Sequence, residues 1–332
     1  MPREWVIHDY SGYQGLTLQA CDEQEPGPGE IRLRVEAFAL NWGDMNLMRD
    51  MYSFSFHRLP ARIGMEAAGI VDAIGPEVTG IELGQRVCTL PYFYYNQGTS
   101  AETAIVDARY VTEAPPGLSA VESASVWMQC MTAYFPVVEL SKAGPGTHFL
   151  ATAGTGTAGT AALEIGRMRG ATMITTTRFE RNRSYLEEVG ANHVIVSGSG
   201  NVAEQLRDVT GGEGIDAAFD PVGAGMIRQY SPALAKNAKI FCYGTLDEAF
   251  PTLPMVDLFQ ANAWFHPYSL FNYVEDAEMC AKGKAFVYDA LASGAIAPRI
   301  DRVYPMEQYR DAWDYLKAPR TSHGKVVIET GI

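Results

Sequence analysis

Three closely spaced glycines have the pattern of a phosphate-binding turn. Gly154, Gly156 and Gly159 stand in G-x-G-x-x-G spacing, after a short β-prone run at residues 148–152 and before helix-forming residues that end at Arg169. In a strand–turn–helix, such glycines allow a tight turn, close approach of backbone N–H groups to a pyrophosphate, and close packing of helix on strand. The pattern predicts a dinucleotide site. The alternative is a glycine-rich turn in another kind of α/β protein.

The end of the next strand indicates which dinucleotide binds. Residues 171–177 are rich in β-branched residues and too short for a helix, so they complete a βαβ unit. NAD sites usually carry Asp or Glu here to bind the ribose 2′-hydroxyl, whereas Thr177 is followed by Arg178, with Arg181 and Arg183 close behind. Guanidinium groups suit a 2′-phosphate, so we expect NADPH as the cofactor. Alternatively, the arginines are a solvated helix start.

Composition limits the class of protein. The chain has 332 residues, 47% of them hydrophobic, which is enough for two domains with separate cores. Its formal net charge of −13 argues against nucleic acid or an anionic membrane as a general partner. The N-terminal residues lack an apolar signal segment, and no stretch is apolar enough to span a bilayer. We therefore expect a cytoplasmic protein.

The cysteines agree with a reducing compartment. None of them forms a C-x-x-C pair, so they indicate neither a disulfide framework nor a zinc site. The five are Cys21, Cys88, Cys130, Cys242 and Cys280.

Two kinds of sequence pattern divide the chain. Residues 1–125 hold short β-like runs, such as residues 31–38, separated by turn clusters, and predict a β-rich, barrel-like domain. Residues 126–271 alternate strands with helices, which predicts a doubly wound parallel sheet. Residues 272–332 break the alternation, so we expect this tail to pack on the N-terminal β domain. The nucleotide-binding domain would then be an insertion within one catalytic domain.

The expected elements can be stated by range. Strands are expected at residues 148–152, 171–177, 193–196, 215–220, 239–243 and 325–329, and the β-prone residues 263–265 are a candidate sixth strand of the parallel sheet. Residues 300–304 form a further segment, to which the pattern assigns no type. Helices are expected at residues 119–140, 161–169, 181–189, 202–209, 226–235, 277–293 and 306–316.

The order of these pieces resembles the medium-chain dehydrogenase/reductase superfamily, in particular its zinc-independent quinone oxidoreductase-like branch. The similarity covers nearly the whole chain. Besides the glycine turn, it rests on PGPGEI from Pro26, ALNWGD from Ala39, GMEAAG from Gly64, GQRV from Gly84, TAY from Thr132, LEEVGA from Leu186, TGGEGI from Thr210, DPVG from Asp220 and HGKVV from His323. The resemblance implies a GroES-like β domain, a Rossmann domain, often a homodimer, and NADPH-dependent reduction of quinones, enones or other activated double bonds. The substrate would be a small apolar or aromatic carbonyl-conjugated molecule.

The resemblance also bears on metal binding. Zinc-dependent relatives place Cys at the position of Asn41 and His at the position of Met65, beside Glu66. Catalytic zinc needs three protein ligands, and a thioether is a poor replacement. The segment where relatives carry structural-zinc cysteines has none here. We therefore expect no metal, and we expect Glu66 to bond to nearby backbone, to Arg62 or to Arg86.

Further site residues follow from the resemblance. Asn41 would lie at the nicotinamide edge and hold the ribose or the substrate oxygen, unless it only caps a turn. Thr132 would contact the nicotinamide region, or else back-bond within its helix. Lys325 matches a lysine near the cofactor in relatives, although an exposed lysine at a strand start would need no explanation. The remaining expected cofactor-binding residues are Thr157, Tyr243, Gly244, Thr245 and Phe265.

The reaction needs a group that acts on the substrate oxygen. Reducing a conjugated C=C places negative charge on the carbonyl oxygen and requires a proton at the α carbon. A tyrosine hydroxyl can serve both needs, and with Asn41 we expect Tyr52 to be catalytic, since the resembling reductases have a Tyr at a similar place. Tyr92, Tyr94 and Tyr95 compete with it, and water is another proton source.

Two departures from the resembling reductases concern the 2′-phosphate. Relatives often have Lys where this chain has Asn182, and Tyr near Ser197. If NADPH binds, Arg178 together with Arg181 or Arg183 would have to hold the 2′-phosphate in place of that Lys and Tyr.

Other functions remain open at this point. One is alcohol or carbonyl oxidoreduction within the same superfamily, and another is a non-catalytic NADPH-binding protein. A short-chain reductase is disfavoured, because no Y-x-x-x-K is present and the Rossmann unit is not N-terminal.

Overall fold

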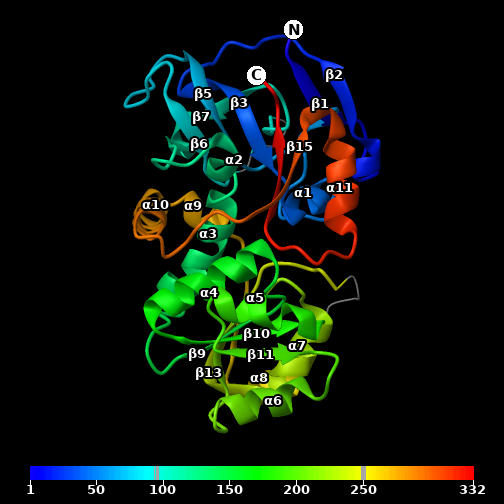
Figure 1. Ribbon diagram of the computed structural model, residues 1–332, viewed down its shortest axis with the longest axis vertical. Helices are drawn as coiled ribbons and strands as arrows, with labels where there is room; N and C mark the ends of the chain where they lie inside the picture. Colours follow the sequence, from blue (N-terminus) through cyan, green and yellow to red (C-terminus); the bar gives the residue numbers. More distant parts are fainter. Residues whose placement is uncertain (93, 95–96, 248–251) are drawn as a thin grey trace. The chain divides into compact units, whose positions relative to one another are not determined.

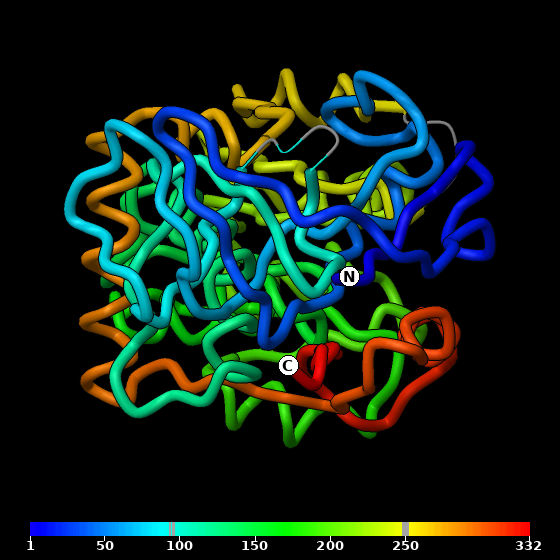
Figure 2. The backbone as a smooth tube through the Cα atoms, turned by 90° about the horizontal axis from the view of Figure 1, so that it is seen from above, coloured from blue at the N-terminus to red at the C-terminus, as the bar shows by residue number. Residues whose placement is uncertain are grey.

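The computed structural model describes residues 1–92, 94, 97–247 and 252–332. The chain forms two compact units, whose elements are labelled in Figure 1. Unit 1 comprises Met1–Met128, Val274–Ala281 and Ala297–Ile332, and unit 2 comprises Gln129–Tyr273 and Lys282–Ile296. Both chain ends therefore belong to unit 1, and they are marked N and C on the blue and red ends of the trace in Figure 2.

Unit 1 is rich in antiparallel sheet. Its seven-stranded sheet has the order β15-β16-β3-β5-β6-β8, with β7 paired to β3, and its three-stranded sheet has the order β2-β1-β4. The strands are β1 (Arg3–Ile7), β2 (Thr17–Ala20), β3 (Glu30–Ala39), β4 (Ala61–Arg62), β5 (Ala67–Ile74), β6 (Arg86–Thr89), β7 (Thr103–Asp107), β8 (Val111–Glu113), β15 (Ile300–Pro305) and β16 (Lys325–Glu329). In β3 the buried Ile31, Leu33 and Val35 alternate with more exposed residues, which confirms the predicted half-buried strand.

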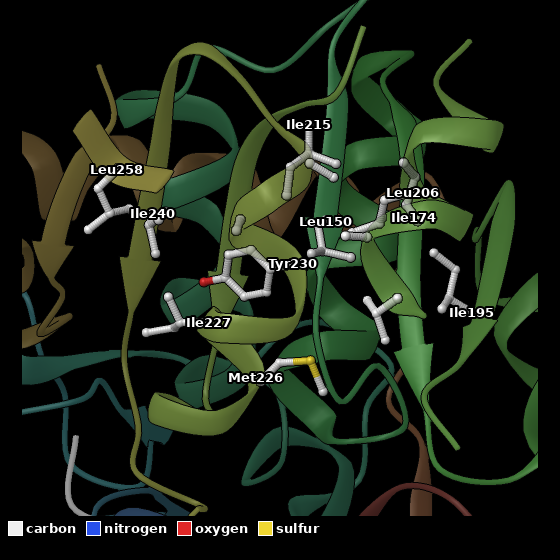
Figure 3. Close-up of a cluster of buried hydrophobic side chains, with 14 residues drawn as sticks. Leu150, Ile174, Ile195, Leu206, Ile215, Met226, Ile227, Tyr230, Ile240 and Leu258 are labelled. Carbon is white, nitrogen blue, oxygen red and sulfur yellow. The ribbon is translucent and has the colours of Figure 1, made fainter. Parts of the chain in front are cut away.

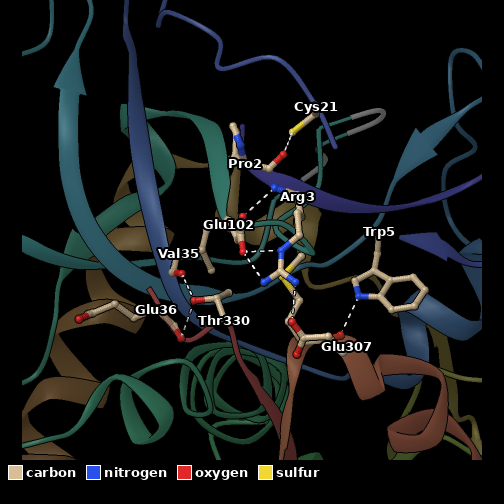
Figure 4. Close-up of polar contacts among 10 residues, drawn as sticks. Pro2, Arg3, Trp5, Cys21, Val35, Glu36, Glu102, Glu307 and Thr330 are labelled. Carbon is tan, nitrogen blue, oxygen red and sulfur yellow. Dashed lines mark hydrogen bonds and ion pairs between the residues drawn. The ribbon is translucent and has the colours of Figure 1, made fainter. Parts of the chain in front are cut away.

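The C-terminal tail is fixed to the N-terminal strands within unit 1 (Figure 4). The Arg3 guanidinium pairs with Glu102 at 2.6 Å and with Glu307 at 2.5 Å. Trp5 Nε1 donates to the carbonyl oxygen of Met306 at 2.8 Å. The helical segments of this unit are η1 (Tyr13–Gly15), α1 (Trp42–Leu47), η2 (Ala108–Tyr110), α2 (Ala120–Ser123), η6 (Met306–Gln308) and α11 (Tyr309–Lys317).

Unit 2 contains a six-stranded sheet in the order β11-β10-β9-β12-β13-β14, and every pair in it is parallel. This confirms the predicted doubly wound α/β sheet. The strands are β9 (His148–Ala151), β10 (Thr172–Thr177), β11 (His193–Val196), β12 (Ile215–Asp220), β13 (Leu234–Cys242) and β14 (Trp264–Pro267). The remaining helical segments are α3 (Trp127–Tyr134), η3 (Phe135–Leu140), α4 (Thr157–Arg169), η4 (Glu180–Asn182), α5 (Arg183–Glu188), α6 (Val202–Val209), α7 (Ala224–Tyr230), η5 (Ser231–Ala233), α8 (Met255–Ala261), α9 (Phe271–Val274) and α10 (Ala277–Ala292).

Apolar side chains from strands and helices form the core on one face of this sheet (Figure 3). Leu150, Ile174 and Ile240 come from three strands, and Leu206 and Ile227 come from two helices. All five are nearly or fully buried. Because parallel strands are covered on both faces, they are apolar along most of their length, which is why the sequence pattern identified them.

The structure differs from the expected domain division at residues 282–296, which were assigned to the first domain but lie in unit 2. The reason is apolar packing between α10 and α3. The rings of Tyr134 and Phe286 lie 5.0 Å apart. Gly283 lies so close to α3 that an added Cβ would be 2.9 Å from Met131 Sδ.

The helix expected at residues 119–140 is interrupted. It consists of α2, α3 and the π-helical η3, which contains Pro136 in its first turn. Proline lacks a backbone N–H, so the regular hydrogen-bond ladder cannot pass through it. Ser141 Oγ donates to the Pro136 carbonyl oxygen at 2.6 Å at the end of this segment. Within the described residues, no helix has the length and apolar character needed to cross a membrane.

Candidate functional site

The glycine turn of unit 2 joins β9 to α4 and is closely packed. An added Cβ at Gly154 would lie 2.0 Å from Thr175 Oγ1, which itself donates to the Ala151 carbonyl oxygen at 2.7 Å. An added Cβ at Gly159 would lie 2.9 Å from Gly154 Cα. Both positions therefore require glycine for the turn to pack on the helix. At Gly156 the nearest atom would be the Ala153 carbonyl oxygen at 3.3 Å, which is a milder restriction.

The first turn of α4 presents backbone N–H groups without a competing acidic group. Gly156 is the N-cap, so no side chain caps this helix, and Thr157, Ala158 and Gly159 follow without an acidic residue in the first turn. The positive end of a helix macrodipole attracts anions, and a glycine N-cap leaves the amide groups accessible. The turn therefore fits a diphosphate group of a dinucleotide.

Two arginines stack on one aromatic ring at the end of β10. The Cζ atoms of Arg178 and Arg181 lie 5.5 Å and 4.1 Å from the centroid of the Phe179 ring. The ring is 41% exposed, so the cluster faces solvent. Thr177 Oγ1, in the last residue of β10, accepts a 2.8 Å hydrogen bond from Asn182 Nδ2. Asn182, where relatives often have Lys, therefore bonds inward to the strand.

Arg183 differs from these two arginines. Its guanidinium pairs with Glu180, and its Nη1 donates to the Val194 carbonyl oxygen at 3.1 Å. Across the described residues, neither Arg178 nor Arg181 makes an ion pair. Arg178 and Arg181 are therefore the guanidinium groups with uncompensated charge here.

The other predicted residues of unit 2 lie in the places expected from the sequence. Thr132 is buried in α3. Tyr243, Gly244 and Thr245 follow the end of β13, where the Tyr243 ring stacks on Phe219 with centroids 4.0 Å apart. Parallel strands bind ligands beyond their carboxyl ends, so this position suits a cofactor contact.

Phe265 lies in β14, in register with Ile240 of β13. It is only partly buried and packs against the apolar core of the sheet. Its predicted contact with the cofactor stays a prediction.

In unit 1, the sheet brings three distant polar residues to one edge. Asn41 lies two residues after the end of β3, Glu66 directly precedes β5, and Lys325 is the first residue of β16. Strands β5 and β16 both flank β3 and run antiparallel to it. Their first residues consequently lie beside the last residues of β3.

These three side chains form a buried polar cluster. Lys325 Nζ donates to Asn41 Oδ1 at 2.6 Å and forms an ion pair with Glu66 Oε1. The side chains of Lys325 and Glu66 are only 2% and 1% exposed. Glu66 Oε2 also accepts a 2.8 Å hydrogen bond from the Met128 backbone N–H. A buried ammonium is tolerated only with such partners.

Asp44 lies next to this cluster and is fully buried. One carboxyl oxygen accepts from the Asn41 backbone N–H at 3.0 Å, whereas Oδ1 has no hydrogen-bond partner among the described residues. Burial raises the pKa of Asp44 to about 7, despite the opposing effects of the Asn41 N–H and the Lys325 charge. The loss of hydration on burial is the main cause of this raised pKa, and the nearby Glu66 carboxylate raises it further.

Tyr52 is half-buried beside α1. Its ring makes an edge contact with Phe54, with centroids 5.7 Å apart, and an added Cβ at Gly43 would lie 2.8 Å from its hydroxyl oxygen. Burial raises the pKa of Tyr52 well above its ordinary value. The competing Tyr92 and Tyr94 are buried, with hydroxyl groups that have no hydrogen-bond partner among the described residues, and Tyr95 lies outside them.

The cluster corrects two sequence expectations. Lys325 is not an exposed lysine at a strand start, because it is buried and paired. Glu66 bonds to backbone as expected, but its charged partner is Lys325. Arg62 instead pairs with Glu4 at 3.4 Å, and Arg86 pairs with the half-buried Glu36 at 2.8 Å. For Glu66 a signal was present in the sequence, since it interrupts an apolar run, whereas Lys325 only precedes one.

No group of three or more His, Cys, Asp or Glu side chains that could hold a metal ion occurs in the described part of the chain. The expected absence of a metal stays a prediction.

Comparison with known proteins agrees with this architecture. Residues 27–116 match the family model of the alcohol dehydrogenase GroES-like domain, and residues 189–328 match the zinc-binding dehydrogenase model. A 2-haloacrylate reductase from Burkholderia sp. is 26% identical over 340 residues, which cover 97% of this chain and 97% of that protein.

Two solved structures are also similar to the chain. A mycobacterial protein complexed with NADPH has a TM-score of 0.90 at 25% identity, covering 99% of this chain and 100% of that one. Escherichia coli quinone oxidoreductase complexed with NADPH has a TM-score of 0.91 at 22% identity, and the match covers 98% of this chain and 99% of that one. This likeness shows a shared fold. The two family models, the full-length relative and the shared fold together show that the chain belongs to the medium-chain dehydrogenase/reductase superfamily.

Proposed function

We propose that this protein is an NADPH-dependent oxidoreductase that reduces an activated double bond in an enone, quinone or enoyl thioester without a metal. The observation that carries the proposal is the combination, in unit 2, of the uncapped glycine turn before α4 and the Arg178–Phe179–Arg181 cluster after β10. The first suits a diphosphate and the second suits an extra phosphate on the ribose. A relative that reduces 2-haloacrylate, which contains an activated C=C, supports the reaction class.

The cofactor would be held by residues of unit 2. The backbone of Gly154, Gly156, Thr157 and Gly159 would face the diphosphate. Arg178 and Arg181 would bind the 2′-phosphate, whereas Arg183 is already engaged with Glu180 and Val194. Thr132 and the segment from Tyr243 to Thr245 would contact the nicotinamide half. When bound, NADPH supplies the hydride.

The chain itself would supply hydrogen bonds to the substrate. Hydride addition to a conjugated C=C places negative charge on the carbonyl oxygen, and donors aimed at that oxygen lower the barrier. Asn41 and Tyr52 are the proposed donors. Because its pKa is raised, the Tyr52 hydroxyl stays protonated throughout the working pH range and is better suited to donate a hydrogen bond than to release its proton. Water would then protonate the α carbon.

The chemistry of the buried cluster supports metal independence. In the resembling zinc enzymes, Cys and His occupy the positions of Asn41 and Met65. Here Asn41 Oδ1 already accepts from the Lys325 ammonium, and Met65 is a fully buried thioether. The Lys325 ammonium, which lies beside Asn41, would repel a zinc ion bound at this position. This donor set does not fit a catalytic zinc ion.

An activity panel tests the proposal. Purified protein and NADPH are mixed with quinones, enones, enoyl thioesters, simple aldehydes and ketones while NADPH absorbance is followed. Faster loss of NADPH with conjugated acceptors than with simple carbonyls is expected. Turnover only with simple carbonyls, together with stoichiometric zinc in the purified protein, would favour the alcohol or carbonyl oxidoreductase alternative. Tight NADPH binding without turnover would favour a non-catalytic protein.

We also propose that the protein is a homodimer. β14 is an edge strand of the unit 2 sheet, and it carries Trp264, which is 68% exposed. Val256 and Phe259 of α8 are 66% and 72% exposed. Exposed apolar side chains on an edge strand and on the helix that precedes it in the chain are typical of a protein interface. We also propose that the protein resides in the cytoplasm, because its five cysteines are all free thiols, as is usual in a reducing compartment.

A further inference from the structure

The Lys325 ammonium determines which way the Asn41 amide points. An ammonium has three donors and no acceptor, so the amide atom that faces Lys325 must be the oxygen. The 2.6 Å bond from Nζ to Oδ1 therefore fixes the orientation chemically, although amide oxygen and nitrogen are often hard to assign. Asn41 Oδ1 is thus occupied by a charged donor.

The other end of the amide is left with donor capacity. Asn41 Nδ2 donates to the Ala39 carbonyl oxygen over 3.4 Å, which is a long hydrogen bond, and its second hydrogen has no acceptor among the described residues. A cation bonded to the carbonyl oxygen of an amide withdraws electron density, so it strengthens the N–H groups as donors. With its oxygen held toward Lys325, the Asn41 side chain has its Nδ2 donor group available to a ligand.

Backbone contacts hold this arrangement in place. The Leu40 N–H donates to the Val326 carbonyl oxygen at 3.0 Å, and the Ala39 N–H donates to the Glu66 carbonyl oxygen at 3.2 Å. These two bonds connect the segments that carry Asn41, Lys325 and Glu66. Because Glu66 also balances the buried charge, Lys325 needs no other counter-ion.

We propose that Lys325 and Glu66 are positioning residues that hold the Asn41 amide as a hydrogen-bond donor to the substrate carbonyl oxygen. This inference rests on the proposed reductase function. It changes the expected role of Lys325, which would act through Asn41 and not by contacting the cofactor. It also identifies Glu66 as a functional residue.

The direct test is Asn41→Asp, which keeps the shape of the side chain and replaces its donor by an acceptor. We expect turnover of an enone to fall at least about 100-fold, a typical loss on removal of one oxyanion donor, while the Kd for NADPH changes less than about threefold. The double variant Lys325→Met/Glu66→Gln removes both charges together, so no uncompensated charge is buried. We expect its kcat to fall about 10-fold or more, because the amide can then turn its oxygen to the substrate.

The matched control is Arg62→Met/Glu4→Gln, which removes another largely buried ion pair of unit 1, with side chains 9% and 18% exposed. We expect its kcat to remain within about threefold of the wild-type value. A spectroscopic readout separates positioning from general destabilisation. The infrared carbonyl stretch of a bound saturated ketone, with NADP⁺ present, should shift to lower frequency in wild-type and control proteins and lose that shift in Asn41→Asp and in Lys325→Met/Glu66→Gln.

The outcomes are distinguishable. If Asn41→Asp keeps the wild-type turnover and the wild-type shift of the carbonyl stretch, the donor role of Asn41 is overturned. The proposed function would still stand in that case, because the wild-type protein would be an active reductase. Equal losses of kcat in Lys325→Met/Glu66→Gln and in the control Arg62→Met/Glu4→Gln would overturn the positioning role of Lys325 and Glu66. A wild-type protein that reduces no substrate of the panel would overturn both proposals. If Lys325→Met/Glu66→Gln does not fold, Asn41→Asp still decides the donor role, because it leaves the ion pair in place.

Discussion

Lys325 Nζ donates a 2.6 Å hydrogen bond to Asn41 Oδ1, although 284 residues separate the two in the sequence. The contact arises because β16, which begins at Lys325, pairs antiparallel with β3, which ends just before Asn41. The last strand of the chain therefore completes a polar cluster begun near its start. Both residues were expected to lie near the cofactor, but the direct bond between them connects their roles.

Replacement of Arg178 by Ala should weaken NADPH binding much more than NADH binding. Loss of a hydrogen bond between charged groups costs about 1.5–3 kcal/mol, which is about 10-fold or more in Kd. Arg181→Ala should behave similarly, and fluorescence titration with both cofactors measures the ratio. Arg207→Ala is the control, because Arg207 is an exposed arginine of the same unit that donates to the Pro232 carbonyl oxygen. Equal weakening of both cofactors by Arg178→Ala would refute the 2′-phosphate role.

Alanine substitutions in the glycine turn should differ in a defined order. At Gly154 the new Cβ would lie 2.0 Å from Thr175 Oγ1, so the turn must shift and we expect a loss of about 2–3 kcal/mol in the free energy of unfolding. At Gly156 the nearest atom is at 3.3 Å, so the loss should be below about 1 kcal/mol. Urea unfolding of both variants measures the difference. The reverse order would contradict the packing described for this turn.

The pH dependence of stability should report on Asp44. Its pKa is raised to about 7 in the folded protein, from 3.8 for an unburied group. Between these values the folded protein holds a proton that the unfolded chain has lost, so the free energy of unfolding falls as pH rises. Asp44→Asn, whose amide oxygen can still accept from the Asn41 N–H, should lose less stability between about pH 5 and about pH 8 than the wild type. Parallel pH profiles for the two proteins would show that Asp44 ionises normally.

Tyr52→Phe separates the two proposed roles of the hydroxyl group. Loss of one donor to the substrate oxygen should lower kcat for an enone about 10-fold to 100-fold, with little change in NADPH affinity. Because burial raises the pKa of Tyr52, the wild-type rate should show no tyrosine ionisation in the neutral range. Steady-state kinetics across pH test both statements. Unaltered turnover in Tyr52→Phe would remove this residue from the mechanism.

Phe259→Glu should disrupt the proposed dimer. The Phe259 side chain is 72% exposed on α8, and a charge there would be unpaired in an apolar interface. Light scattering should give the mass of a dimer for the wild type and of a monomer for the variant. Leu83→Glu is the matched control, because Leu83 is also largely exposed, at 65%, but lies in unit 1. A monomeric wild-type protein would contradict the proposal.

Local patterns predicted the regular elements of unit 2 well. The helix expected at residues 202–209 coincides with α6, whose N-cap Asn201 accepts from the Ala203 and Glu204 N–H groups. The strand expected at residues 193–196 coincides with β11. Both follow from short-range signals, namely capping chemistry and runs of β-branched residues.

One departure has a local cause and the other a long-range cause. α7 ends at Tyr230, before the end expected from the sequence, where Pro232 stops the regular ladder. The ion pair of Lys325 with Glu66 could not be predicted from spacing, because it depends on which strands flank β3. A charged residue inside an apolar run is a usable signal of burial, but it does not name the partner.

Calorimetric titration of the wild-type protein with NADPH and with NADH tests the central claim most directly. The proposed site predicts one NADPH per chain, bound at least about 10-fold more tightly than NADH, because two arginines with uncompensated charge lie after β10. Absence of NADPH binding, or equal affinity for the two cofactors, would contradict it.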